Sequence, residues 1–345
     1  MVYFREIVFT KAPLEQAFRY KDLFQLVPYQ PKWRKPSISK YVVDFPCILE
    51  YCLSEEECKD VQQLLDKERE ICILLTAFST YRVFQYDIHA SSWGVKIPFN
   101  CSDIGSKRQL RRMRSQVSEF YYPMFFYPRI KKDLKITGFT EVPPEGMMEI
   151  AEHYPSYLHF EHGRYDLKRE PPVSFTKDTV RCLDKYYALN ESSRKKVFSA
   201  ARLITDSIEL MDYRYSLSFL AAVASLEAMA DIADNGGNQV VEECGSCHSI
   251  KYSPYTCPKC GKYIWGVTTK VKDFLKTYVS AKEEDVANYN KIYNLRSKIT
   301  HVGDIFTKDS IFKSTGTREH QEFEMGYRVI VYARQALKSL MLKQP

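Results

Sequence analysis

Long apolar runs are missing from this sequence, which argues against an exported or membrane-spanning protein. Segment 1–13 alternates charged with apolar residues, so we expect no export signal there. The longest apolar stretch, 217–230, is interrupted by Ser218, Ser225 and Glu227 and is shorter than the roughly 20 residues that a membrane span needs. We therefore expect no membrane association and interpret this stretch as a buried core helix.

A regular cysteine framework is also missing. Four of the ten cysteines form two Cys-x-x-Cys pairs, and the other six are scattered among apolar neighbours. This usage is typical of a reducing compartment, where cysteines serve as metal ligands or buried thiols, and it predicts a cytoplasmic protein. Wholesale disorder is excluded because 45% of the residues are hydrophobic and only 27% are charged.

The length of 345 residues favours two domains over one. Residues 1–168 carry the alternation of half-buried strands at 41–51 and 81–88, with a helical pattern between them. Residues 169–345 change to helical spacing. The sequence therefore predicts an α+β protein, with a mixed α/β domain followed by an all-helical bundle. The expected helices of the bundle are 177–188, 191–211, 213–233, 267–279, 284–302 and 318–342.

One segment, 240–264, interrupts the helical pattern with two Cys-x-x-Cys pairs. The four cysteines are Cys244, Cys247, Cys257 and Cys260. Zinc favours four tetrahedral thiolates, and each pair directs two sulfurs at one point. We predict a zinc-ribbon insertion with one structural Zn²⁺ per chain and no catalytic metal, because four sulfurs leave no position for water. Buried thiols or two disulfides are the alternative interpretation.

Segment 293–303 contains the pattern Arg296-x4-His301. Histidine can move a proton at physiological pH, and arginine binds phosphate oxygens in a two-pronged manner. Together they suit cleavage of a phosphodiester by a neighbouring 2′-hydroxyl. A histidine near a helix C-terminus can also simply pair with the free carbonyl groups.

On a regular α-helix, the five residues from Arg296 to His301 amount to about 500°, which places the two positions about 140° apart. They do not share a face. Asn294, Ser297 and His301 do share one, and we include Asn294 and Ser297 as supporting residues. The arginine must then reach that face through its long side chain or act on a second copy of the chain.

The helix at 218–230, the segment 292–303 and the long closing helix together resemble the HEPN (higher eukaryotes and prokaryotes nucleotide-binding) superfamily, and within it the Apea-like group of bacterial proteins. The resemblance covers about residues 175–343. It implies an all-helical bundle that forms a homodimer in which two Arg-x4-His motifs face one cleft. It also implies a metal-independent endoribonuclease that leaves a cyclic phosphate and a 5′-hydroxyl, with a role as a toxin or antiviral-defence effector.

Carried over by position, the resemblance assigns Arg296 to the phosphate and His301 to proton transfer, and it places Glu227 near the site. Glu227 equally suits a paired polar group at a helix edge. Ser297 stands where the family commonly has Asn, Asp or His, which leaves open a catalytically inactive RNA-binding or protein-interaction module. An inhibitor or trigger is expected as a partner, because an unrestrained ribonuclease would harm its host.

The net charge of +7 permits a polyanionic partner without requiring one. A basic cluster precedes the aromatic run 120–127 in the first domain. This composition is typical of an RNA-binding surface, where cations neutralise phosphates and rings stack on bases. A solvent-exposed helix followed by a buried strand would give the same sequence pattern. The cluster consists of Lys107, Arg108, Arg111, Arg112 and Arg114.

Overall fold

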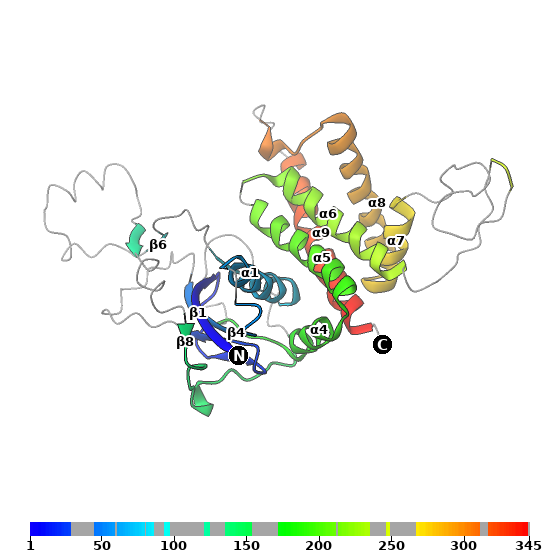
Figure 1. Cartoon of the computed structure of the whole chain (residues 1–345). Coiled ribbons are helices and arrows are strands. Elements are labelled where there is room, and N and C mark those ends of the chain that lie inside the picture. Colours follow the sequence, from blue (N-terminus) through cyan, green and yellow to red (C-terminus); the bar gives the residue numbers. More distant parts are fainter. Residues whose placement is uncertain are drawn as a thin grey trace, which may run out of the picture. The chain divides into compact units, whose positions relative to one another are not determined.

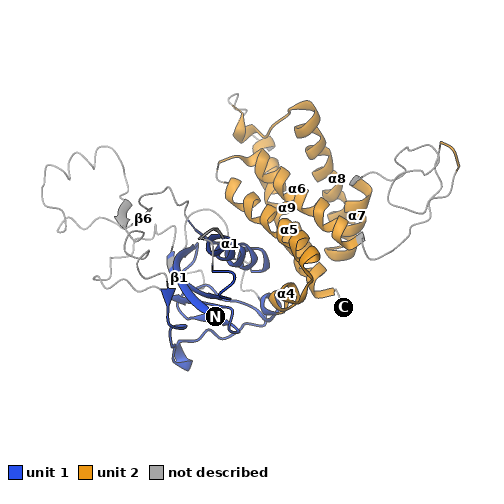
Figure 2. Cartoon of the chain, viewed as in Figure 1, with its two compact units in different colours: residues 1–180 blue, residues 181–345 orange. Residues whose placement is uncertain are grey.

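The computed structural model of the chain divides into two compact units, residues 1–180 and 181–345 (Figure 2). The composition of the sequence places the boundary near residue 168, whereas the division falls after residue 180, inside helix α4 (Lys177–Ala188). The residues that the structure describes are 1–28, 45–58, 61–79, 81–85, 93–96, 121–124, 135–153, 172–211, 213–234, 246–248, 267–310 and 317–343.

The first unit is built on an antiparallel sheet (Figure 1). Its strands are β1 (Val2–Thr10), β2 (Phe18–Tyr20), β3 (Phe24–Pro28), β4 (Phe45–Leu53), β5 (Val83–Phe84) and β8 (Lys135–Ile136). The strand order is β2-β3-β4-β1-β5, and β8 also pairs with β1. Strands β1 and β4 pair along their whole lengths. A separate two-stranded sheet joins β6 (Trp93–Lys96) to β7 (Tyr121–Met124).

Helix α1 (Val61–Phe78) contacts β5. Ile71, Leu74, Leu75 and Phe78 are buried at three- and four-residue spacings on one face, and Cys72 and Ala77 are buried as well, so the C-terminal half of α1 is enclosed on more than one side. Thr76 fixes the contact, because its side chain donates a hydrogen bond to the Val83 carbonyl and accepts one from the Val83 amide, each at 2.9 Å. Strands and helices in this unit, with a helical second unit, confirm the α+β class.

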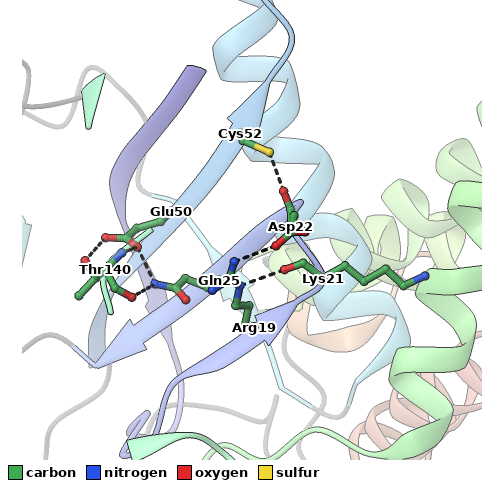
Figure 3. A network of polar contacts seen from close by, with 7 residues as sticks. All are labelled: Arg19, Lys21, Asp22, Gln25, Glu50, Cys52 and Thr140. Carbon is green, nitrogen blue, oxygen red and sulfur yellow. Dashed lines mark hydrogen bonds and ion pairs between the residues drawn. The ribbon is translucent and has the colours of Figure 1, made fainter. Parts of the chain in front are cut away.

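A buried polar network joins β3, β4 and the segment after β8 (Figure 3). Glu50 of β4 is 1% exposed and accepts hydrogen bonds from Gln25 Nε2 at 2.7 Å and from the Thr140 amide at 2.8 Å. The Thr140 hydroxyl donates to its other carboxylate oxygen at 2.5 Å. Because both oxygens have donors, the buried carboxylate is compensated and holds segment 135–153 to the sheet.

Glu68 of α1 is a second buried carboxylate with weaker compensation. The residue is 2% exposed, and its Oε1 has no hydrogen-bond partner among the described residues. Burial, with a smaller effect of the Glu6 carboxylate, raises the pKa of Glu68 well above the usual range. The folded unit therefore favours the protonated form of this side chain.

The raised pKa of Glu68 predicts how stability depends on pH. The unfolded chain releases this proton near the ordinary pKa of a glutamate, whereas the folded chain keeps it to higher pH, so stability is lost as the pH rises between the two values. Glu68→Gln removes this titration. We expect the difference in unfolding free energy between variant and wild type to grow by about 1–3 kcal/mol from pH 5 to pH 8 in urea unfolding. The control is Glu55→Gln at an exposed position, and an equal difference at both pH values would contradict the prediction.

Within the residues that the structure describes, the second unit contains helices joined by turns and irregular segments, and no strand. Its elements are α4, α5 (Glu191–Leu210), α6 (Tyr215–Asp234), α7 (Val267–Tyr278), α8 (Glu283–Ser297), a π-helical turn (Lys298–Val302), a 3₁₀ turn (Thr307–Asp309) and α9 (Thr317–Lys343). Helix α6 contacts α5, α7, α8 and α9 and is the central element of this unit (Figure 1).

Helix α6 is the one described helix that is long and apolar enough to cross a membrane, with a mean hydropathy of 1.5 over Tyr215–Ala233. Half of this window is buried inside the protein, and the core helix of a soluble protein has the same properties. Its fully buried residues include Phe219, Ala222, Leu226 and Met229. Length and composition alone therefore give only weak evidence for a membrane span.

The helices expected from the sequence correspond to α4–α9, with one difference in shape. The pattern at 284–302 predicts a single helix, whereas α8 ends at Ser297 and a π turn follows. The Gly303 amide donates to the Lys298 carbonyl, five residues back, as in a π-helix. Gly303 ends the turn with φ of 74°, a left-handed conformation that favours glycine.

The segment after the π turn, 303–310, is tied to the start of α6. The Asp309 carboxylate accepts hydrogen bonds from the Tyr215 amide at 2.9 Å and the Ser216 amide at 2.5 Å. It therefore caps α6 and places a negative charge at the positive end of the helix dipole. The Ser216 hydroxyl accepts from the Phe306 amide at 2.9 Å. These bonds fix where the end of the π turn lies in the bundle.

Candidate functional site

Arg296 lies in the last turn of α8, with its side chain 33% exposed. Its Nε is 3.6 Å from Oε1 of Glu227 on α6, whose side chain is 26% exposed. This distance defines an ion pair but exceeds that of a hydrogen bond. Among the described residues, no hydrogen bond reaches the Arg296 guanidinium. Its five N–H donors are therefore available to an anionic ligand.

Tyr293, one turn before Arg296, lies next to the same carboxylate. It is 6% exposed, and within the described ranges neither its hydroxyl nor Glu227 Oε1 makes a hydrogen bond of standard geometry, although the hydroxyl is near enough to favour the charged carboxylate. Partial burial raises the pKa of Glu227, and the charge of Arg296 and the Tyr293 hydroxyl partly oppose the shift. Burial, then the Glu227 charge, raises the pKa of Tyr293. Sequence reasoning missed Tyr293, although three-residue spacing from Arg296 places both side chains on one face.

Asp231 and Lys270 form a second acid–base pair one turn along α6. Lys270 Nζ of α7 donates to Asp231 Oδ1 at 2.6 Å. The Asp231 charge also raises the pKa of Glu227. Glu227 and Asp231 of α6 thus each face one base, and the formal charges of these four groups cancel.

His301 lies in the π turn and is exposed. Its side chain makes no hydrogen bond or ion pair with another described residue. The angle expected for a regular α-helix does not hold here, because a turn closed from residue i to i+5 rotates less per residue. Arg296 and His301 are therefore separated by a smaller angle about the helix axis than the sequence predicts. Asn294 and Ser297, the supporting residues, are both exposed on α8.

Most of the other predicted site residues lie outside the part of the chain that the structure describes. They are Lys107, Arg108, Arg111, Arg112, Arg114, Cys244, Cys257 and Cys260. Cys247 belongs to the described turn 246–248 and is half-buried. The described residues contain no group of three His, Cys, Asp or Glu side chains that could hold a metal ion. Because three of the four expected ligands lie elsewhere, zinc binding and the RNA-binding role of the basic cluster stay predictions.

A cavity of about 380 Å³ lies where the 3₁₀ turn meets the first turns of α6 and α9. The ammonium of Lys308 stands 3.9 Å from the centre of the Tyr215 ring and already covers that face. The residues that line the cavity are Tyr215, Phe306, Lys308, Glu319, His320, Glu322 and Phe323. None of the residues singled out from the sequence lines this cavity.

In comparisons with known proteins, the chain matched no family model, no curated protein and no solved structure. The candidate site therefore rests on its own geometry. A half-exposed guanidinium without hydrogen bonds suits an oxyanion, and an exposed imidazole at the end of the same helix suits proton transfer.

The two buried tyrosines of α8 predict opposite responses to loss of a hydroxyl. We expect Tyr293→Phe to leave the free energy of unfolding unchanged, or to raise it by up to about 1 kcal/mol, because the buried hydroxyl has no partner. Tyr289, one turn earlier, donates to the Ser280 carbonyl at 2.9 Å, so Tyr289→Phe should lower it by about 1 kcal/mol. Urea unfolding measures both. Equal losses in the two variants would contradict the prediction.

Proposed function

We propose that the chain is a metal-independent endoribonuclease of the HEPN type, with residues 181–345 as its catalytic unit. The observation that carries the proposal is the half-exposed Arg296 guanidinium, which makes no hydrogen bond to a described residue, close in sequence to an exposed His301 imidazole. Both groups are accessible to a polynucleotide. The resemblance of segments 218–230 and 292–303 to that superfamily supplies the reaction class.

In the proposed reaction, the 2′-oxygen of RNA attacks the adjacent phosphorus and the bond to the 5′-oxygen breaks. The 2′-hydroxyl loses a proton and the departing 5′-oxygen gains one, which leaves a 2′,3′-cyclic phosphate and a 5′-hydroxyl. The His301 imidazole handles one of these protons, and Arg296 stabilises the negative charge that develops on the phosphate. In this proposal, Asn294, Ser297 and Glu227 act as supporting residues.

A homodimer is part of the proposal, because one chain supplies a single Arg-x4-His motif. Two motifs facing one cleft would supply one imidazole for each of the two proton transfers. RNA is the substrate, and the basic cluster at 107–114 would add phosphate contacts. We place the protein in the cytoplasm as a toxin or antiviral-defence effector that is restrained by an inhibitor or awaits a trigger.

A catalytically inactive RNA-binding or protein-interaction module is the second candidate. One specific contact favours it: Glu227 faces the guanidinium and neutralises the charge that a phosphate would need. Ser297 directly after the arginine points in the same direction, because it replaces the amide, carboxylate or imidazole common at this position in the family. Cleavage assays distinguish the two candidates.

We also propose a zinc ribbon at 240–264, with Cys244, Cys247, Cys257 and Cys260 as ligands of one structural Zn²⁺. Four thiolates would supply folding energy that so short a segment cannot draw from a core of its own. The metal would take no part in cleavage.

The cleavage assay uses purified full-length protein, mixed cellular RNA and excess EDTA. We expect wild type to cut RNA, and His301→Ala and Arg296→Ala to lose about 100-fold or more of the rate, because each removes one catalytic group. The matched control is His320→Ala, another exposed histidine of the same unit, which should keep wild-type activity. Equal activity of wild type and His301→Ala would refute the enzymatic proposal.

Metal analysis tests the zinc ribbon separately. We expect wild type to carry about one zinc per chain, and Cys257→Ser with Cys260→Ser to lose it and to unfold at lower temperature. Cys182→Ser alters a fully buried thiol of α4, so it should lower stability while leaving the zinc content unchanged. Zinc content that does not differ between wild type and the double variant would exclude this site.

A further inference from the structure

The Arg296 cluster carries no net charge. Glu227 of α6 faces Arg296 and Tyr293 of α8, and Asp231 lies one turn away on its own helix. Lys270 of α7 pairs with Asp231. Arg296, Tyr293 and Asp231 are the groups that shift the pKa of Glu227, and Lys270 acts on Asp231. Two carboxylates and two bases cancel, so an approaching oxyanion meets no net attraction.

Glu227 holds the guanidinium only loosely. The 3.6 Å between Arg296 Nε and Glu227 Oε1 is too long for a hydrogen bond, and both side chains are partly exposed. The guanidinium can therefore turn to another anion without breaking a hydrogen bond. The same carboxylate, however, repels that anion at short range.

The charged form of Glu227 is poorly accommodated. Its Oε1 is buried without a hydrogen-bond partner, and the adjacent Tyr293 hydroxyl, also buried, has none among the described residues. Burial disfavours this charged form and raises the pKa of Glu227, whereas the charge of Arg296 and the Tyr293 hydroxyl offset part of that effect. Uptake of a proton by Glu227 thus removes the free-energy cost of keeping a charged carboxylate partly buried.

We propose that Glu227 is a charge gate for an oxyanion site at Arg296. When charged, it neutralises the guanidinium and repels a phosphate or sulfate group; when it takes up a proton, the cluster gains one positive charge and binds that group. The inference rests on the proposed function only where it names RNA as the source of the phosphate. It makes the supporting residue Glu227 a regulator of substrate affinity.

Two probes separate the gate from the ribonuclease proposal. Sulfate keeps the same charge from pH 6 to pH 8, and its binding is followed through the NMR signal of the Arg296 Nε–H, assigned with Arg296→Lys. A fluorescent 2′-deoxy oligonucleotide cannot be cleaved by 2′-hydroxyl attack, and anisotropy measures its affinity. The full chain is used as wild type, as Glu227→Gln and as the matched control Asp231→Asn, which removes an acid one turn away on the same helix.

At pH 8 we expect Glu227→Gln to bind both probes about tenfold more tightly than wild type, because one unit of nearby negative charge is gone. Asp231→Asn should change affinity by less than about threefold, since Asp231 is paired with Lys270 and its side chain is 74% exposed. Wild-type affinity for sulfate should rise towards that of Glu227→Gln as the pH falls, because Glu227 then takes up a proton.

Equal or weaker sulfate binding by Glu227→Gln would overturn the gate, and so would equal effects of the two substitutions or the absence of sulfate binding in all proteins. Wild-type sulfate affinity that does not change between pH 6 and pH 8 would overturn it without reliance on any variant. If the gate operates on sulfate while the oligonucleotide does not bind and RNA stays intact, the gate stands and the ribonuclease proposal fails.

Discussion

Burial of α6 is the constraint on which the second unit depends. Four helices contact it, and several of the polar groups that it carries are met by a neighbour. Every such contact also fixes one neighbour: Ser218 donates to the Ser207 carbonyl of α5, Asp231 pairs with α7, Glu227 faces α8, and Asp309 caps the first turn. The polar exceptions of an apolar helix thus position the elements around it.

This arrangement gives Arg296 two demands that conflict. In the fold, it offsets a half-buried carboxylate, whereas in the proposed reaction it has to stabilise a phosphate. A close, hydrogen-bonded pair with Glu227 would serve the first demand and weaken the second. The observed spacing of 3.6 Å, with no hydrogen bond, keeps part of the electrostatic benefit and leaves the donors available.

The sequence was sufficient for the helices of the second unit and insufficient for the details of the site. Apolar residues at three- and four-residue spacings determine which face of α5, α6 or α9 is buried, so period alone places them. The end of α8 depends on which carbonyl each amide of 298–303 selects, and no periodicity encodes that choice. Tyr293 was missed because a buried aromatic residue at helical spacing looks like ordinary core.

The first unit was harder to predict. Strand β1 was not predicted because charged residues within Val2–Thr10 interrupt its apolar pattern. The strand nevertheless pairs with all of β4. Glu50 could not be identified as buried either, because its partners Gln25 and Thr140 lie 25 and 90 residues away in sequence. Contacts of this range are fixed by tertiary structure, which local patterns do not report.

A π turn accommodates one residue more than the α-helical turn it replaces, so 298–302 can be regarded as a single-residue insertion at the end of α8. A relative that lacks this extra residue would continue α8 as a regular α-helix. Its histidine would then point in a different direction about the helix axis, while Arg296 stayed in place. Motif spacing in such relatives would then change by one without any loss of the fold. The distance in sequence between the two motif residues is therefore a poor guide to their distance in space.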